Sequence, residues 1–165
     1  MKKALVFISL MVLTIIFTIS AIAQKSSYSG TWKLDRTKSV VPEYTPVLTR
    51  ITVTMKADSI FTKRYYDIGD GNEYPFDENL PLNGTNVSIT IYDMPRKTNV
   101  TWSDIDNTVN LTSTITFYDS GSPVDFNSKE TWKVDKATNT LTISFANKSN
   151  QGEANGHFVL SKVSQ

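Results

Sequence analysis

Few residues in this chain could do chemistry, because its 165 residues include one histidine and no cysteine. A single imidazole, His157, cannot build a histidine-cluster metal site, and the lack of cysteine removes thiolate ligands and thiol nucleophiles. The sequence contains no G-x-S-x-G, P-loop or H-E-x-x-H motif. We therefore expect no catalytic residue, no metal site and no cofactor, and a protein that is not an enzyme.

Glu130 is the charged residue whose position is most informative. In a strand over 129–134 side chains alternate between two faces, so Glu130 shares the apolar face with Trp132 and Val134. Burying a carboxylate without a partner is costly, so we expect either a basic partner inside the protein or a polar group of a ligand. The candidate partners are Arg96, Lys162 and Arg64. The orientation of the Arg64 strand stays open, because Phe61 and Tyr65 occupy its other face.

The elements that position these residues are predicted to be strands. Alternation of apolar and polar residues recurs after residue 23, and no segment has sustained helical periodicity. Short turn clusters, such as 104–107 and 119–123, favour antiparallel neighbours. The pattern predicts an all-β protein of about nine strands. They span 28–34, 47–55, 59–66, 87–92, 96–103, 108–117, 129–134, 140–145 and 157–163.

Sequential antiparallel strands with one apolar face close most simply into a single up-and-down barrel, here of about eight to ten strands. A two-sheet β-sandwich has the same alternation and is the alternative architecture. The longest irregular stretch, 67–84, is rich in glycine and proline and is predicted to be a connector, with a lid as the alternative. Its oxygen-bearing side chains do not have EF-hand spacing, so a solvated acidic loop is favoured over a calcium site. These side chains are Asp67, Asp70, Asn72, Glu73, Asp77 and Glu78.

Residues 1–23 have the pattern of a secretory signal peptide. Lys2 and Lys3 precede an apolar run over 4–19, and an A-x-A cleavage site ends at Ala23. An uncleaved anchor is disfavoured, because polar residues interrupt the run and no basic flank follows it. We expect a cleaved signal peptide over 1–23 and one domain over 24–165. Without a cysteine to carry a lipid, the mature chain is expected to be soluble, exported to the periplasm or secreted, with no lipid anchor and no membrane span.

Four motifs carry a resemblance to a known family. They are G-T-W-K-L-D-x-x-K-S at 30–39, T-W-S-D at 101–104 and K-E-T-W-K-V-D at 129–135, with Q-G-E before the last strand. Together they resemble small exported bacterial lipocalin-like domains over essentially the whole mature chain, although the T-D-Y motif of the larger family is absent. The resemblance implies structural roles for Gly30, in close packing of the first strand, and for Trp32, which would plug the closed end of a barrel. It also implies a basic cover for Trp32 from the last strand, where Lys162 is the candidate.

The predicted binding site follows from strand parity. Inward positions on neighbouring strands should converge on one interior, and any ligand should contact several of them. The predicted ligand-binding residues are Trp102, Phe117, Glu130, Trp132, Phe145 and Arg64. The resulting function is a binding protein that holds a small apolar or amphipathic molecule in a barrel. The near-neutral formal charge of +1 gives no reason to expect a nucleic-acid partner.

Two other functions stay open at this point. Four tyrosines could stack on sugars from outside the barrel, as in a carbohydrate-recognition or surface-interaction module. These are Tyr65, Tyr66, Tyr74 and Tyr92. A hydrolase that uses the carboxylates of Glu130 and Asp104 is the most distant alternative, because nothing in the sequence places them across a cleft.

Overall fold

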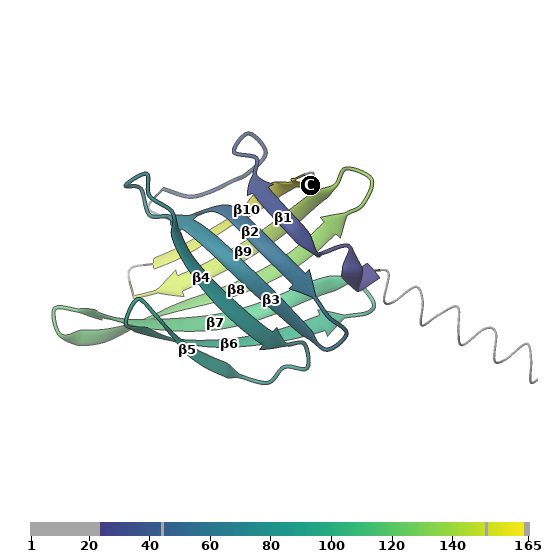
Figure 1. Cartoon of the computed structure of the whole chain (residues 1–165). Helices are drawn as coiled ribbons and strands as arrows, with labels where there is room; N and C mark the ends of the chain where they lie inside the picture. The colour runs from purple at the N-terminus through teal and green to yellow at the C-terminus, as the bar shows by residue number, and fades with distance from the viewer. Residues whose placement is uncertain (1–23, 44, 151, 164–165) are drawn as a thin grey trace, which may run out of the picture.

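The computed structural model describes residues 24–43, 45–150 and 152–163, which form one nearly closed antiparallel barrel (Figure 1). The expected signal peptide, 1–23, lies outside the described residues. Within them, no helix has both the length and the apolar character needed to cross a bilayer. The strands are β1 (Gly30–Leu34), β2 (Val47–Met55), β3 (Ser59–Asp67), β4 (Tyr74–Pro81), β5 (Val87–Ile91), β6 (Met94–Ser103), β7 (Thr108–Asp119), β8 (Ser122–Asp135), β9 (Thr140–Ser149) and β10 (Gly152–Lys162).

The strand order confirms the up-and-down barrel and rules out the sandwich. All ten strands lie in one sheet, in the order β4-β3-β2-β1-β10-β9-β8-β7-β6-β5. The first and last strands pair with each other, with Trp32 opposite Lys162. The two sheet edges, β4 and β5, are therefore consecutive in the chain, and the seam of the barrel lies between them.

Side chains and a short connection span this seam. The segment after β4 crosses to β6, where the Gly84 amide donates to the Val100 carbonyl at 2.9 Å. At the other end of the seam the Tyr92 hydroxyl donates to the Pro75 carbonyl at 2.6 Å. The Tyr74 and Tyr92 rings meet edge to face there, with centroids 6.0 Å apart. The edges are thus joined by side-chain and loop contacts, although β4 and β5 do not form a ladder.

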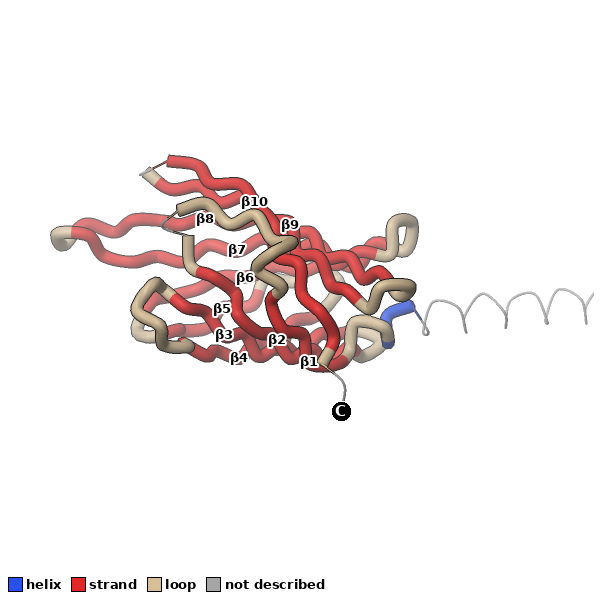
Figure 2. Tube along the Cα trace, turned by 90° about the horizontal axis from the view of Figure 1, so that it is seen from above, coloured by secondary structure: helices blue, strands red, loops and turns tan. Residues whose placement is uncertain are grey.

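The structure corrects the prediction for residues 67–84. This stretch contains strand β4, which pairs with β3 and is neither a connector nor a lid. Pro75 and Pro81 are typical of loops, but an edge strand tolerates proline because one of its sides has no neighbouring strand to which it must donate hydrogen bonds. Strands β7 to β10 are also longer than predicted, and the β7–β8 hairpin projects beyond the neighbouring strands (Figures 1 and 2).

The closed end of the barrel is filled by a packed core. Trp32 is 1% exposed, and its indole N–H donates to the Tyr28 carbonyl at 2.9 Å. The Lys162 ammonium lies 5.0 Å from the centre of the Trp32 ring. Gly30 has a φ of 139° and faces this lysine, because a Cβ at Gly30 would lie 2.7 Å from the Lys162 Cε. Gly30 therefore lets Lys162 cross β1 and cover the tryptophan.

Candidate ligand cavity

The other half of the barrel is hollow. It contains a cavity of about 440 Å³ beneath the β5–β6 turn, the start of β4 and the segment that leads into β2. Most of its wall is aliphatic or aromatic, as is usual for sites that bind small molecules. The apolar lining includes Tyr74, Phe76, Ile91, Tyr92, Met94, Ile115, Phe126, Phe145 and Phe158.

Strand alternation explains how this lining is built. On β8 the inward positions Phe126, Ser128 and Glu130 line the cavity, and the next inward residue, Trp132, is in the core. On β4 Phe76 lines the cavity, whereas Leu80 is in the core. The change from cavity wall to packed core thus occurs partway along both strands.

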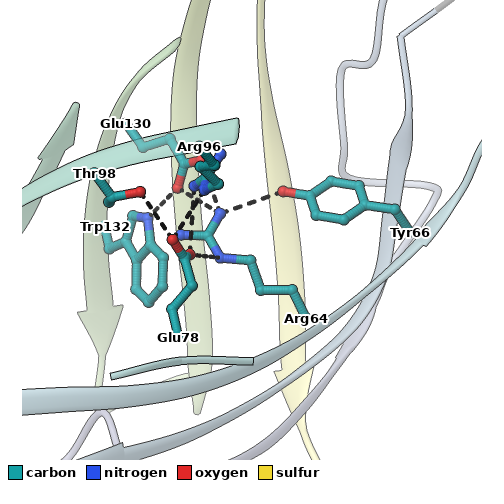
Figure 3. A network of polar contacts seen from close by, with 7 residues as sticks. All are labelled: Arg64, Tyr66, Glu78, Arg96, Thr98, Glu130 and Trp132. Carbon is teal, nitrogen blue, oxygen red and sulfur yellow. Dashed lines mark hydrogen bonds and ion pairs between the residues drawn. The ribbon is translucent and has the colours of Figure 1, made fainter. Parts of the chain in front are cut away.

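Four charged side chains mark the boundary between the two halves, and we call them the ionic layer. Arg64 and Glu78 are buried on β3 and β4, and Arg96 and Glu130 are buried on β6 and β8. The Arg64 Nη1 donates to both Glu130 oxygens, at 2.8 and 3.1 Å (Figure 3). The Arg96 Nε and Nη2 donate to the two Glu78 oxygens at 2.9 and 3.3 Å. The Arg64 Nε lies 3.6 Å from Glu78, which joins both pairs into one network.

Neutral groups add further hydrogen bonds to this layer, although the buried Arg64 Nε and Nη2 make none to the described residues (Figure 3). The Trp132 indole donates to Glu130 at 2.7 Å, and the Thr98 hydroxyl donates to Glu78 at 2.9 Å. Arg64 also donates to the Tyr66 hydroxyl at 3.3 Å, and its guanidinium lies 4.9 Å from the centre of the Trp132 ring. These contacts offset part of the cost of burying the four charges.

The surroundings shift the pKa values of the layer. Burial raises the pKa of the Glu78 carboxyl, but the guanidiniums of Arg64 and Arg96 outweigh burial and hold it below its usual range. Burial likewise lowers the pKa of Arg64, but the combined effects of Glu130, Tyr66 and Glu78 outweigh burial and raise this pKa above its usual value. Burial raises the pKa of Tyr66, so its hydroxyl keeps its proton at neutral pH. Glu78 is therefore ionised and Tyr66 is neutral.

Not all the predicted site residues lie at the cavity. Glu130 and Phe145 line it, and Arg64 and Trp132 lie directly beneath Glu130. Trp102 is instead at the closed end, edge to face with Tyr28 at 5.6 Å between centroids. Phe117 lies opposite Val124 in the projecting part of the β7–β8 hairpin and does not line the cavity. Parity determines which face of a strand a residue occupies but not its height along the barrel axis, so it grouped residues from different levels.

Arg64 is the partner of Glu130 among the three candidates. Arg96 pairs with Glu78 instead, and Lys162 covers Trp32 at the closed end. Sequence reasoning missed the role of Glu78 because residues 67–84 were predicted to be irregular. The alternation of Tyr74, Phe76, Glu78 and Leu80 was the signal that could have revealed it.

The residues behind the two alternative functions do not form a separate site on the outer surface. Tyr66, Tyr74 and Tyr92 line the apolar cavity inside the barrel. Tyr65 faces outward, and the Arg50 guanidinium lies 3.8 Å from the centre of its ring. Asp104 accepts a hydrogen bond from the Trp102 indole and does not line the cavity that contains Glu130. In the acidic stretch Asp70 bonds to Tyr74 and Glu73 pairs with Arg50. Across residues 24–43, 45–150 and 152–163, no group of three or more acidic or histidine side chains could hold a metal ion.

Comparisons with known proteins do not add a function to this geometry. No known protein family matches the chain, and neither the curated proteins nor the solved structures give a significant match. The function therefore has to be argued from the cavity and the ionic layer themselves.

Proposed function

We propose that this protein binds a small, largely apolar molecule inside its barrel. The observation that carries the proposal is the cavity of about 440 Å³ with a mainly aromatic and aliphatic wall. An apolar wall that is not filled by side chains gains free energy when it contacts a ligand in place of water. The polar groups at one end of the cavity would orient such a ligand.

The fold and the N-terminal pattern support this proposal. An antiparallel barrel that encloses a ligand cavity is consistent with the lipocalin-like resemblance of the sequence. We also propose that residues 1–23 are cleaved and that the domain over 24–165 acts after export, in the periplasm or outside the cell. Mass spectrometry of the mature protein is expected to give a chain that begins at Gln24; a chain that retains residues 1–23 would overturn the export proposal.

The binding proposal can be tested with an uncharged, environment-sensitive dye such as Nile red. We expect saturable fluorescence enhancement with the wild-type protein. Ile115→Trp should abolish it, because Ile115 lines the cavity and an indole would occupy the ligand volume. Thr112→Trp is the matched control, because it introduces the same side chain at an exposed position of the same strand.

Equal dye binding by both tryptophan variants would contradict the proposal, because the dye would then not be in the cavity. Loss of folding in Ile115→Trp is checked by circular dichroism before binding is compared. Native mass spectrometry of the purified protein is an independent measurement, and a copurified small molecule is the expected result.

A further inference from the structure

The charges of the side chains that line the cavity cancel each other. Among the cavity-lining residues of the described chain only Arg96 and Glu130 are charged, and they have opposite signs. Each is already paired with a buried residue of the ionic layer. Arg96 lies 2.9 Å from Glu78, and Glu130 lies 2.8 Å from Arg64. The cavity therefore presents a polar end without an unpaired charge.

This balance disfavours a charged ligand. An anionic head group at the polar end would lie beside the Glu130 carboxylate, and both nearby guanidiniums are already engaged with carboxylates. A cationic head group would lie beside Arg96 in the same way. In either case the ligand charge would leave water without gaining an opposite charge of its own, which is unfavourable in an apolar cavity.

Uncharged hydrogen-bonding groups remain available at the same place. The Tyr66 hydroxyl accepts a hydrogen bond from Arg64, and within the described residues its own proton has no acceptor. Ser128 lines the cavity with a hydroxyl that makes no hydrogen bond to any described residue. The Glu130 carboxylate accepts from Arg64 and Trp132 and has room for one further donor. The site thus offers both donors and an acceptor to a neutral group.

We propose that the ligand is amphipathic, with an uncharged head group such as an alcohol or an amide that hydrogen-bonds at the ionic layer. Its hydrocarbon part lies against the aromatic wall formed by Phe76, Phe126, Phe145 and Phe158. This inference rests on the proposed binding function and specifies the chemical class of the ligand.

The test compares decanamide with decanoate as competitors for Nile red at neutral pH. The two molecules have nearly the same size and shape and differ in charge, so the comparison isolates the head group. Decanol and decylammonium extend the series to a second neutral head and to a cation. We expect decanamide and decanol to displace the dye at concentrations at least tenfold lower than decanoate and decylammonium.

Glu130→Gln tests whether the ionic layer sets this preference. Removing the carboxylate charge leaves an excess of positive charge at the ionic layer. The concentration of decanoate that displaces the dye should therefore fall at least tenfold relative to that of decanamide. Glu73→Gln is the matched control, because Glu73 is on the outer surface in an ion pair with Arg50. This variant should leave the ratio of the decanoate and decanamide concentrations that displace the dye unchanged. If Glu130→Gln does not fold, the wild-type comparison still decides the proposal.

The outcomes separate this inference from the proposed function. If the dye binds and decanoate competes as well as decanamide, the neutral-head inference is overturned and the binding function stands. An unchanged ratio in folded Glu130→Gln would also overturn it, since the layer would not control selectivity. If neither the dye nor any competitor binds, the binding function itself fails and the inference fails with it.

Discussion

Glu130 shows how one residue can be both buried and charged in the interior of a barrel. It is 8% exposed and is held by Arg64 and by the Trp132 indole. A buried pair gains little over an apolar pair of the same volume, but removing one partner leaves the other uncompensated. A substitution that removes the charge of Arg64 or of Glu130 alone should therefore destabilise the fold.

Glu130→Gln is expected to destabilise the fold. Arg64 is 1% exposed and would lose its closest carboxylate, so the free energy of unfolding should fall by about 3 to 5 kcal/mol. Glu73→Gln is the control and should change it by less than about 1 kcal/mol, because both members of that pair are on the surface. Denaturant unfolding measures both. Equal stability of the two variants would show that the Arg64 pair has no structural role.

Trp32→Ala should be the most damaging change at the closed end. It removes a fully buried indole, its hydrogen bond to Tyr28 and the surface that Lys162 covers. We expect a loss of about 3 to 5 kcal/mol, which is typical of aromatic deletions in a core. Ile105→Ala is the control, because Ile105 is 92% exposed and its loss should cost less than about 0.5 kcal/mol. A loss below about 1 kcal/mol for Trp32→Ala would contradict the packing seen at this end.

At the scale of the elements, the segment between β1 and β2 is fixed to the middle of β10. Val40 and His157 exchange two backbone hydrogen bonds of 2.9 and 2.8 Å. This contact requires close approach, because a Cβ at Gly156 would overlap the Val40 carbonyl oxygen and lie 2.7 Å from the Phe145 ring. The same segment continues to Thr45 and Pro46, which line the cavity. Gly156 thus allows the middle of β10 to contact the segment that leads to the cavity wall.

Gly156→Ala tests this contact. The added methyl group would force the segment away from β10, and we expect destabilisation of about 1 to 3 kcal/mol, as for other overpacked sites. Asn155→Ala is the control on the same strand, because Asn155 is exposed and should change stability by less than about 0.5 kcal/mol. Hydrogen exchange at the Val40 amide should become faster in Gly156→Ala alone. Unchanged stability and exchange would mean that the segment can shift at no cost.

At the scale of the whole molecule, the ionic layer divides the barrel into a packed half and a hollow half. The packed half provides a continuous core, which includes both Trp32 and Trp132. The hollow half contributes less buried contact, and the layer provides its polar end. The stability of the whole barrel should therefore depend on the ionisation of the layer.

The pH dependence of unfolding tests this through Glu78. Its pKa is lowered in the folded state, so its stabilisation is present above the unfolded pKa, near 4.5, and is lost as the pH falls through the folded pKa. Wild-type stability should decline in this acidic range more steeply than that of Glu78→Gln, which has no carboxyl to protonate. Denaturant unfolding from about pH 7 to pH 3 measures the difference between the two curves. Parallel curves would show that the charge of Glu78 does not stabilise the barrel.

The sequence by itself determined the fold class and the faces of most strands. Alternation as in Val109, Leu111 and Ile115 marks one buried face, and sequential antiparallel strands then favour a barrel. The same pattern placed Glu130 inside, because its parity is that of Trp132. Period two is a local property of the backbone, so it can be detected without any knowledge of the partners.

Only the tertiary structure decided which inward residues lie at the same height and which charges meet. Arg64 and Glu130 are 66 positions apart in the chain and become neighbours through the closure of the barrel. Closure also separates Trp102 from the cavity and makes β4 an edge strand that can contain prolines. These features depend on strand register and tilt around the whole barrel, which no local sequence pattern encodes.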